Sequence, residues 1–73
     1  MTRTSETICV KVNGQDKAIP AGATVAQLLE LLGLTRTACA VEVNRELVPK
    51  ARHGERALGP GDEVEIVTLV GGG

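Results

Sequence analysis

Only one stretch of this chain has the periodicity of an amphipathic helix, and that limits the folds open to it. Four apolar residues recur at the i, i+3, i+4 and i+7 spacing of one helix face: Val25, Leu28, Leu29 and Leu32. Thr24 can cap the helix start, because its hydroxyl accepts from the Gln27 amide while the Gln27 side chain reaches back. Gly33 can end the helix in the left-handed conformation. A helix of about ten residues is marginal alone in water, so the rest of the chain must cover its apolar stripe.

The remaining apolar runs are typical of strands. Alternating or β-branched residues predict strands at 8–13, 15–19, 39–44, 47–49 and 63–70. Asn13-Gly14 predicts a two-residue hairpin, because both residues tolerate the positive φ of a type I′ turn. Gly59-Pro60-Gly61-Asp62 predicts a tight turn before the last strand. The order strand, strand, helix, strand, short strand, strand favours an α+β fold: a mixed sheet of four to five strands curled over one helix, which is the β-grasp architecture of ubiquitin.

Size and charge exclude several classes of protein. The 73 residues fit a single domain at 1–73, with a disordered start at 1–6 and a flexible glycine tail at 71–73. A chain of this length buries only about 60% of its unfolded surface, so an enzyme that encloses its own substrate is not expected. A net charge of −1 and the absence of aromatic residues argue against nucleic-acid binding. No apolar run approaches the roughly 20 residues of a membrane span, and the start lacks the apolar segment of a signal peptide, so we expect no membrane contact and a cytoplasmic location.

The cysteines and the histidine do not form a recognisable site in the sequence. Cys9 and Cys39 lie in predicted strands without further ligands at metal-binding spacing. We therefore interpret them as reduced residues packed in or beside the sheet, and expect no metal. His53 stands alone in a polar segment at 50–56 and is predicted to be solvated.

The last predicted strand has apolar residues on both faces. Val64, Ile66 and Val70 share one parity, whereas Val67 and Leu69 share the other. If the helix covers only one face, Val67 and Leu69 are exposed. They then belong either to a partly covered sheet back or to a protein-docking patch. Glu42, on the outward face of a predicted neighbouring strand, can add a polar contact at the rim.

The chain ends in Gly71-Gly72-Gly73. A frayed end or a cloning scar would explain such a tail, but it also suits a specific task. Extended, it reaches on the order of 10 Å, and without Cβ atoms it can thread a narrow tunnel, which leaves the Gly73 carboxylate unhindered. A carboxylate must be activated before it accepts a nucleophile, for example as an acyl adenylate. The sequence contains no nucleotide-binding glycine motif, so we expect no bound cofactor here and ATP to be used by an activating partner.

Four segments carry a family resemblance: VNG at 12–14, TVAQLLELLGL at 24–34, VEVNRELVPK at 41–50 and GDEVEIVTLVGGG at 61–73. With them the chain resembles the ThiS-type sulfur carriers of thiamine (thiazole) biosynthesis over residues 8–73. The resemblance implies that Gly73 is adenylated by an E1-like adenylyltransferase (ThiF type), with Gly71 and Gly72 as the threading tail. It implies a thiocarboxylate on Gly73, made with sulfur mobilised by a cysteine desulfurase and delivered to thiazole synthase (ThiG type). The chain would then be a protein cosubstrate and not an enzyme.

Other interpretations stay open. The small subunit of molybdopterin synthase also ends in Gly-Gly on this fold, so a molybdopterin-type or other sulfur carrier is one alternative. A ubiquitin-like modifier or a plain binding module is another. A modifier would leave isopeptide adducts on other proteins, whereas a carrier would be released unattached.

Overall fold

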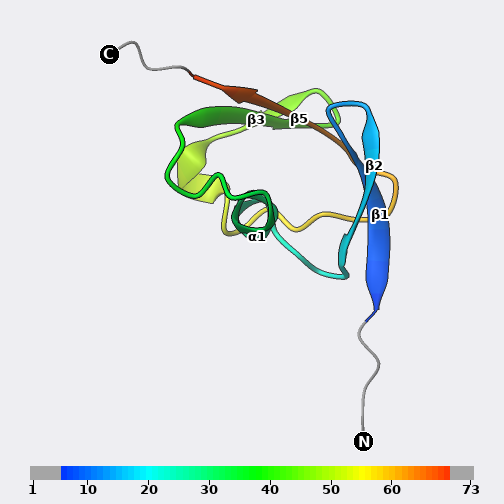
Figure 1. Cartoon of the computed structure of the whole chain (residues 1–73). Helices are drawn as coiled ribbons and strands as arrows, with labels where there is room; N and C mark the ends of the chain where they lie inside the picture. The colour runs from blue at the N-terminus through cyan, green and yellow to red at the C-terminus, as the bar shows by residue number, and fades with distance from the viewer. Residues whose placement is uncertain (1–5, 70–73) are drawn as a thin grey trace, which may run out of the picture.

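A mixed five-stranded sheet curves around a single helix (Figure 1). The computed structural model describes residues 6–69. The start predicted to be disordered therefore lies, apart from Glu6, outside the described residues, and so does the glycine tail at 71–73. The elements in chain order are β1 Thr7–Val12, β2 Gln15–Pro20, α1 Val25–Leu31, β3 Cys39–Val43, β4 Glu46–Val48, the 3₁₀ helix η1 Lys50–Arg52, and β5 Glu63–Thr68.

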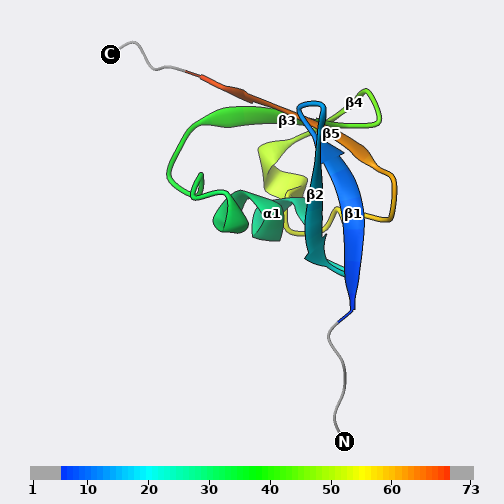
Figure 2. The same ribbon diagram turned by 45° about the vertical axis from the view of Figure 1, so that its right-hand side comes forward.

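The strand order in the sheet is β2-β1-β5-β3-β4. The first and last strands, β1 and β5, run parallel at the centre, and all other neighbouring pairs are antiparallel. The helix α1 lies on the concave side of this sheet (Figures 1 and 2). The predicted β-grasp architecture is confirmed, with β4 as the short edge strand that Leu47-Val48-Pro49 indicated.

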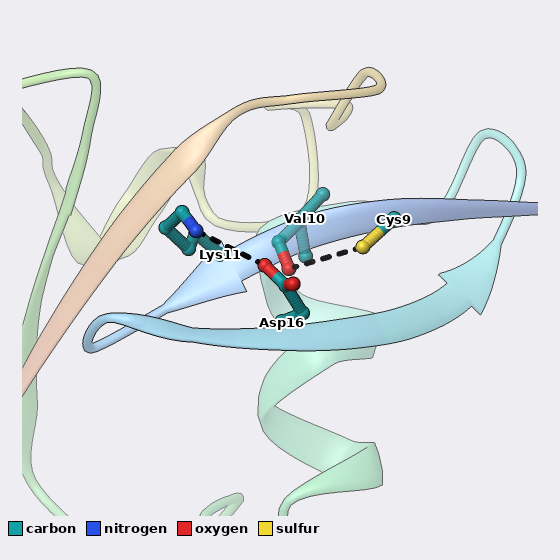
Figure 3. A network of polar contacts seen from close by, with 4 residues as sticks. All are labelled: Cys9, Val10, Lys11 and Asp16. Carbon is teal, nitrogen blue, oxygen red and sulfur yellow. Dashed lines mark hydrogen bonds and ion pairs between the residues drawn. The ribbon is translucent and has the colours of Figure 1, made fainter.

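The hairpin between β1 and β2 forms as the Asn13-Gly14 dipeptide predicts. Both residues have positive φ, 50° and 84°, and they join the paired residues Val12 and Gln15. Such angles match the right-handed twist of the flanking strands. On the face of this hairpin that turns away from α1, Lys11 Nζ lies 3.1 Å from Asp16 Oδ1 in an exposed ion pair (Figure 3).

Both ends of α1 are closed by local hydrogen bonds. Thr24 Oγ1 accepts from the Gln27 amide at 3.2 Å, and Gln27 Oε1 accepts from the Thr24 amide at 2.9 Å, which completes the predicted capping box. At the other end Gly33 has a φ of 74°, and the Leu34 amide donates to the Leu29 carbonyl at 2.8 Å. These features form a Schellman motif. The helix spans seven residues, fewer than the ten predicted, because the closing turn already begins at its last positions.

The core lies between α1 and the concave face of the sheet. The predicted helix stripe is buried at Val25, Leu28 and Leu29, while Leu32 is half-buried against the core. The strands contribute Val10, Ile19, Val41, Val43, Val48, Val64 and Ile66. Ala23 and Leu58, both from connecting segments, complete the core, and the Leu58 amide donates to the Ala23 carbonyl at 2.9 Å.

The prediction that His53 is solvated in a polar loop is wrong. The segment begins with the 3₁₀ helix η1 and packs beneath the sheet next to α1 (Figure 2). His53 is only 8% exposed. Its Nε2 lies 3.0 Å from the Val48 carbonyl oxygen, and its own carbonyl accepts from the Ala26 amide at 2.9 Å. The imidazole can be buried because a backbone partner satisfies its ring nitrogen.

The cysteines lie in β1 and β3 as free residues, Cys9 exposed and Cys39 half-buried beside the core. The Cys9 sulfur is 3.9 Å from the Val10 carbonyl oxygen (Figure 3). Within residues 6–69, no group of three His, Cys, Asp or Glu residues is placed to hold a metal ion. No helix in this part of the chain has both the length and the apolar character needed to cross a membrane.

Candidate functional site

The candidate site is the C-terminal half of β5 and the face of the sheet around it. The glycines predicted to carry the chemistry, Gly71, Gly72 and Gly73, lie outside the described residues, so the structure places the strand that leads to them. In Figure 1 the red end of β5 points away from β1 and β2. The end of β5 at Thr68 therefore lies away from the hairpin of β1 and β2.

The two sides of β5 are held unequally. On one side β3 pairs with it from Val43↔Val64 to Cys39↔Thr68, and the Leu69 amide adds a hydrogen bond to the Ala38 carbonyl at 2.8 Å. On the other side β1 pairs with it only at Lys11↔Glu63 and Val12↔Val64. The strand thus diverges from β1 after its first two residues but stays on β3 to its end.

Val67 and Leu69 are exposed, as the parity of the strand predicts. Val67 is 57% exposed and Leu69 is 53% exposed, whereas Ile66 is 7% exposed. The register places Val67 opposite Ala40 of β3. Isolated exposed apolar residues are common, so exposure alone leaves their role in docking a prediction.

The two side chains do not share one depression on the surface. Val67 lines a shallow groove of about 550 Å³ together with Asn13 and Glu65. Leu69 lines a second hollow, of about 600 Å³, together with Cys39 and His53. The structure therefore separates Val67 and Leu69 into neighbouring sites at the end of β5, where parity alone suggests a single patch.

Glu42 lies on the same outward face of the sheet as Val67, and it is half-buried. The register places it opposite Glu65 of β5 and, on its other side, opposite Leu47 of β4, which is 63% exposed. Two carboxylates directly opposite each other are unfavourable in a sheet. This part of the outward face therefore carries two neighbouring carboxylates and an exposed apolar side chain, while Lys11 and Arg45 line the groove beside Val67. Glu65 and Leu47 were not predicted, because their proximity to Glu42 depends on the cross-strand register.

The side chains of Asn13 and Asn44 also bind the backbone of β5. The sequence predicted a turn at Asn13 and no role for Asn44. Asn13 Nδ2 donates to the Ile66 carbonyl at 3.1 Å, and its Oδ1 accepts from the Ile66 amide at 2.8 Å. Asn44 Oδ1 accepts from the Glu63 amide at 3.0 Å. The first contact joins residues 53 positions apart, so no local pattern could have revealed it.

The sequence of this chain is similar to those of known proteins. A model of the ThiS family matches residues 10–73. The chain is 42% identical over 62 residues to a thiazole synthase from Paramagnetospirillum magneticum, covering 85% of this chain and 19% of that protein. It is 30% identical over 61 residues to the sulfur carrier protein ThiS from Escherichia coli, covering 84% of this chain and 92% of that protein.

The chain spans about a fifth of the length of the thiazole synthases that it matches, 19% in one case and 20% in a second, from Magnetococcus marinus. Among solved structures it resembles the thiamine biosynthesis protein ThiS from Geobacter metallireducens. The TM-score is 0.77 at 26% sequence identity, and the match covers 90% of this chain and all of that one (100%).

Proposed function

Because this chain belongs to the ThiS family, whose model matches residues 10–73, we propose that it is a sulfur carrier protein of thiamine biosynthesis. The observation that carries the proposal is the course of β5, a central strand that is held on β3 to its end and continues in sequence into Gly71-Gly72-Gly73. A strand anchored in the core is a rigid base for a tail that enters another protein. In this role the chain is a cosubstrate of partner enzymes and not a catalyst.

The proposed chemistry takes place at the α-carboxylate of Gly73, which must be free in the working protein. A carboxylate oxygen attacks the α-phosphate of ATP bound to an E1-like adenylyltransferase of the ThiF type, and pyrophosphate leaves. The terminal sulfur of a persulfide formed by a cysteine desulfurase then attacks the acyl adenylate and displaces AMP, which gives an acyl disulfide. A thiol reductant, such as the excess cysteine, cleaves the S–S bond of this acyl disulfide and is itself oxidised to a disulfide. The product is a thiocarboxylate on Gly73. This chain binds no cofactor in the scheme, and ATP belongs to the activating partner.

The proposed acceptor of the sulfur is a thiazole synthase of the ThiG type. Support comes from the protein named thiazole synthase, which contains a segment 42% identical to this chain within a polypeptide about five times as long. A related segment in the same polypeptide as the synthase is expected if the two must meet during the reaction, since linkage raises their effective concentration. We further propose that Gly71 and Gly72 thread a narrow channel of the partner enzyme, so that the carboxyl carbon of Gly73 reaches the reaction site.

We further propose that Val67, Leu69 and Glu42 contact the activating enzyme. Among residues 6–69, Val67 and Leu69 are the exposed large apolar side chains nearest in sequence to the tail, at 57% and 53% exposure. Glu42 stands opposite Glu65 on the same face as Val67. A basic group on the partner placed at Glu42 and Glu65 would relieve this like-charge pair, so the surface suits an apolar contact with a cation at that point.

Intact mass spectrometry tests the proposal. The untagged chain is incubated with a ThiF-type adenylyltransferase, MgATP, cysteine and a desulfurase, after its mass has confirmed a free Gly73. We expect a gain equal to the replacement of one oxygen by sulfur, localised to Gly73 by fragmentation. A matched variant with one alanine after Gly73 should fold normally but gain no sulfur. Isopeptide adducts on other proteins, or equal labelling of the extended variant, would contradict the carrier function.

A further inference from the structure

We propose that Asn13 is a positioning residue that fixes the direction in which the C-terminal segment leaves the sheet. The inference rests on the proposed function, because it concerns how the tail is presented to the activating enzyme. It goes beyond the turn-forming role that the Asn13-Gly14 dipeptide predicts.

The backbone of β1 cannot hold the second half of β5. At Asn13 and Gly14 the chain turns back with φ values of 50° and 84°, so the β1 ladder with β5 ends at Val12↔Val64. The Asn13 amide adds one further hydrogen bond, to the Val64 carbonyl at 2.9 Å. Beyond that point β1 offers no backbone partner to β5.

The Asn13 side chain takes the place of the missing strand residue. Its amide group pairs with both backbone groups of Ile66, at 3.1 Å to the carbonyl oxygen and 2.8 Å from the amide nitrogen. The side chain therefore extends the β1 side of the ladder by one residue pair. Both contacts are partly buried, and unpaired backbone groups in such a position are costly.

This contact makes Ile66 the last residue of β5 that is held from both sides, among residues 6–69. After it, Thr68 pairs with Cys39 and the Leu69 amide bonds to the Ala38 carbonyl, so β3 alone guides the chain. A strand held on one edge can rotate or peel about that edge. The double hydrogen bond at Ile66 limits this motion immediately before Val67 and the tail.

Asn44 provides a matched control within the same strand. It also has a positive φ, 52°, and its side chain also accepts from a β5 amide, that of Glu63, at 3.0 Å. This contact lies at the start of β5, away from the tail. Glycine at either position keeps the backbone conformation accessible and removes only the side-chain clamp.

The first test is amide hydrogen exchange of the full chain by NMR. In Asn13→Gly we expect exchange at Ile66, whose amide donates to the Asn13 side chain, to rise about 5- to 30-fold, the factor that corresponds to the loss of one or two net hydrogen bonds. Asn44→Gly should raise exchange at Glu63 and leave Ile66 unchanged. Asn13→Asp, which keeps the acceptor but loses the donor, should lie between wild type and Asn13→Gly. Unchanged exchange at Ile66 in folded Asn13→Gly would overturn the inference.

The second test is steady-state adenylation by the ThiF-type enzyme with the carrier as the varied substrate. Asn13→Gly should lower kcat at least about fivefold, with KM within about twofold of wild type, since the side chains proposed to dock are untouched and only the tail direction changes. Asn44→Gly should retain both constants. If Asn13→Gly and Asn44→Gly lose kcat equally, the Asn13 side chain has only a structural role. That result would overturn this inference but not the proposed function. If a ThiF-type enzyme adenylates the carrier protein of its own organism but not the wild-type chain, the proposed function is overturned, and this inference with it.

Discussion

Replacing Leu28 by alanine should strongly destabilise this protein, whereas the same change at Leu31 should have almost no effect. Both residues lie in α1, but Leu28 is fully buried at 0% exposure and Leu31 is 55% exposed. Comparing the two variants therefore separates the contribution of core packing from that of intrinsic helix propensity, because alanine does not lower the helix propensity at either position.

The magnitude follows from the geometry of the helix. Leucine to alanine removes three buried carbons, worth roughly 2.4 kcal/mol at about 0.8 kcal/mol each. The helix is closed at its start by the Thr24 capping box and at its end by Gly33, so it is poorly placed to shift and fill the void. The residual cavity adds to the cost, and we expect about 3 kcal/mol in total, within the observed range of about 2 to 5 kcal/mol.

The assay is urea unfolding followed by far-ultraviolet circular dichroism, because the chain has no Trp or Tyr for fluorescence. A loss of about 3 kcal/mol corresponds to a fall of about 12 to 24 °C in Tm for a domain of this size. It is a large share of a typical stability of about 5 to 15 kcal/mol. Leu31→Ala should stay within about 0.5 kcal/mol of wild type. If Leu28→Ala is no less stable than Leu31→Ala, the assignment of the helix face to the core is refuted.

Three further predictions concern the docking surface, the buried histidine and the helix cap. Leu69→Glu should weaken binding of the ThiF-type enzyme in isothermal titration at least about tenfold while Tm stays within a few degrees. Leu31→Glu, at an exposed leucine that does not line the Leu69 hollow, should not weaken it. A large fall in Tm would show that Leu69 belongs to the core. His53→Ala should cost about 1 to 3 kcal/mol in urea unfolding, because it leaves the Val48 carbonyl without its partner, and wild-type stability would contradict the buried hydrogen bond. Thr24→Ala should cost about 1 kcal/mol by the same assay through loss of the side-chain acceptor at the helix start, and a neutral effect would show that the cap contributes nothing.

The features that could be predicted from the sequence depend on residues close together in the chain. The Asn13-Gly14 turn, the capping box at Thr24 and the glycine after the helix each involve neighbours within about five positions. Their geometry follows from backbone conformation and local hydrogen bonding. The alternation of apolar residues likewise predicted which face of β5 is exposed, because successive side chains of a strand point to opposite sides.

Tertiary structure decided which distant residues meet. His53 lies in a polar segment of the sequence, yet it is buried because Val48 supplies a backbone partner. Glu42 faces Glu65 only in the register that pairs β3 with β5. Asn13 reaches Ile66 across 53 positions of sequence because β1 and β5 run parallel at the centre of the sheet. The sequence by itself thus determined the elements and their apolar faces, whereas the partners of individual polar groups depended on the packing of whole elements, which no short-range pattern encodes.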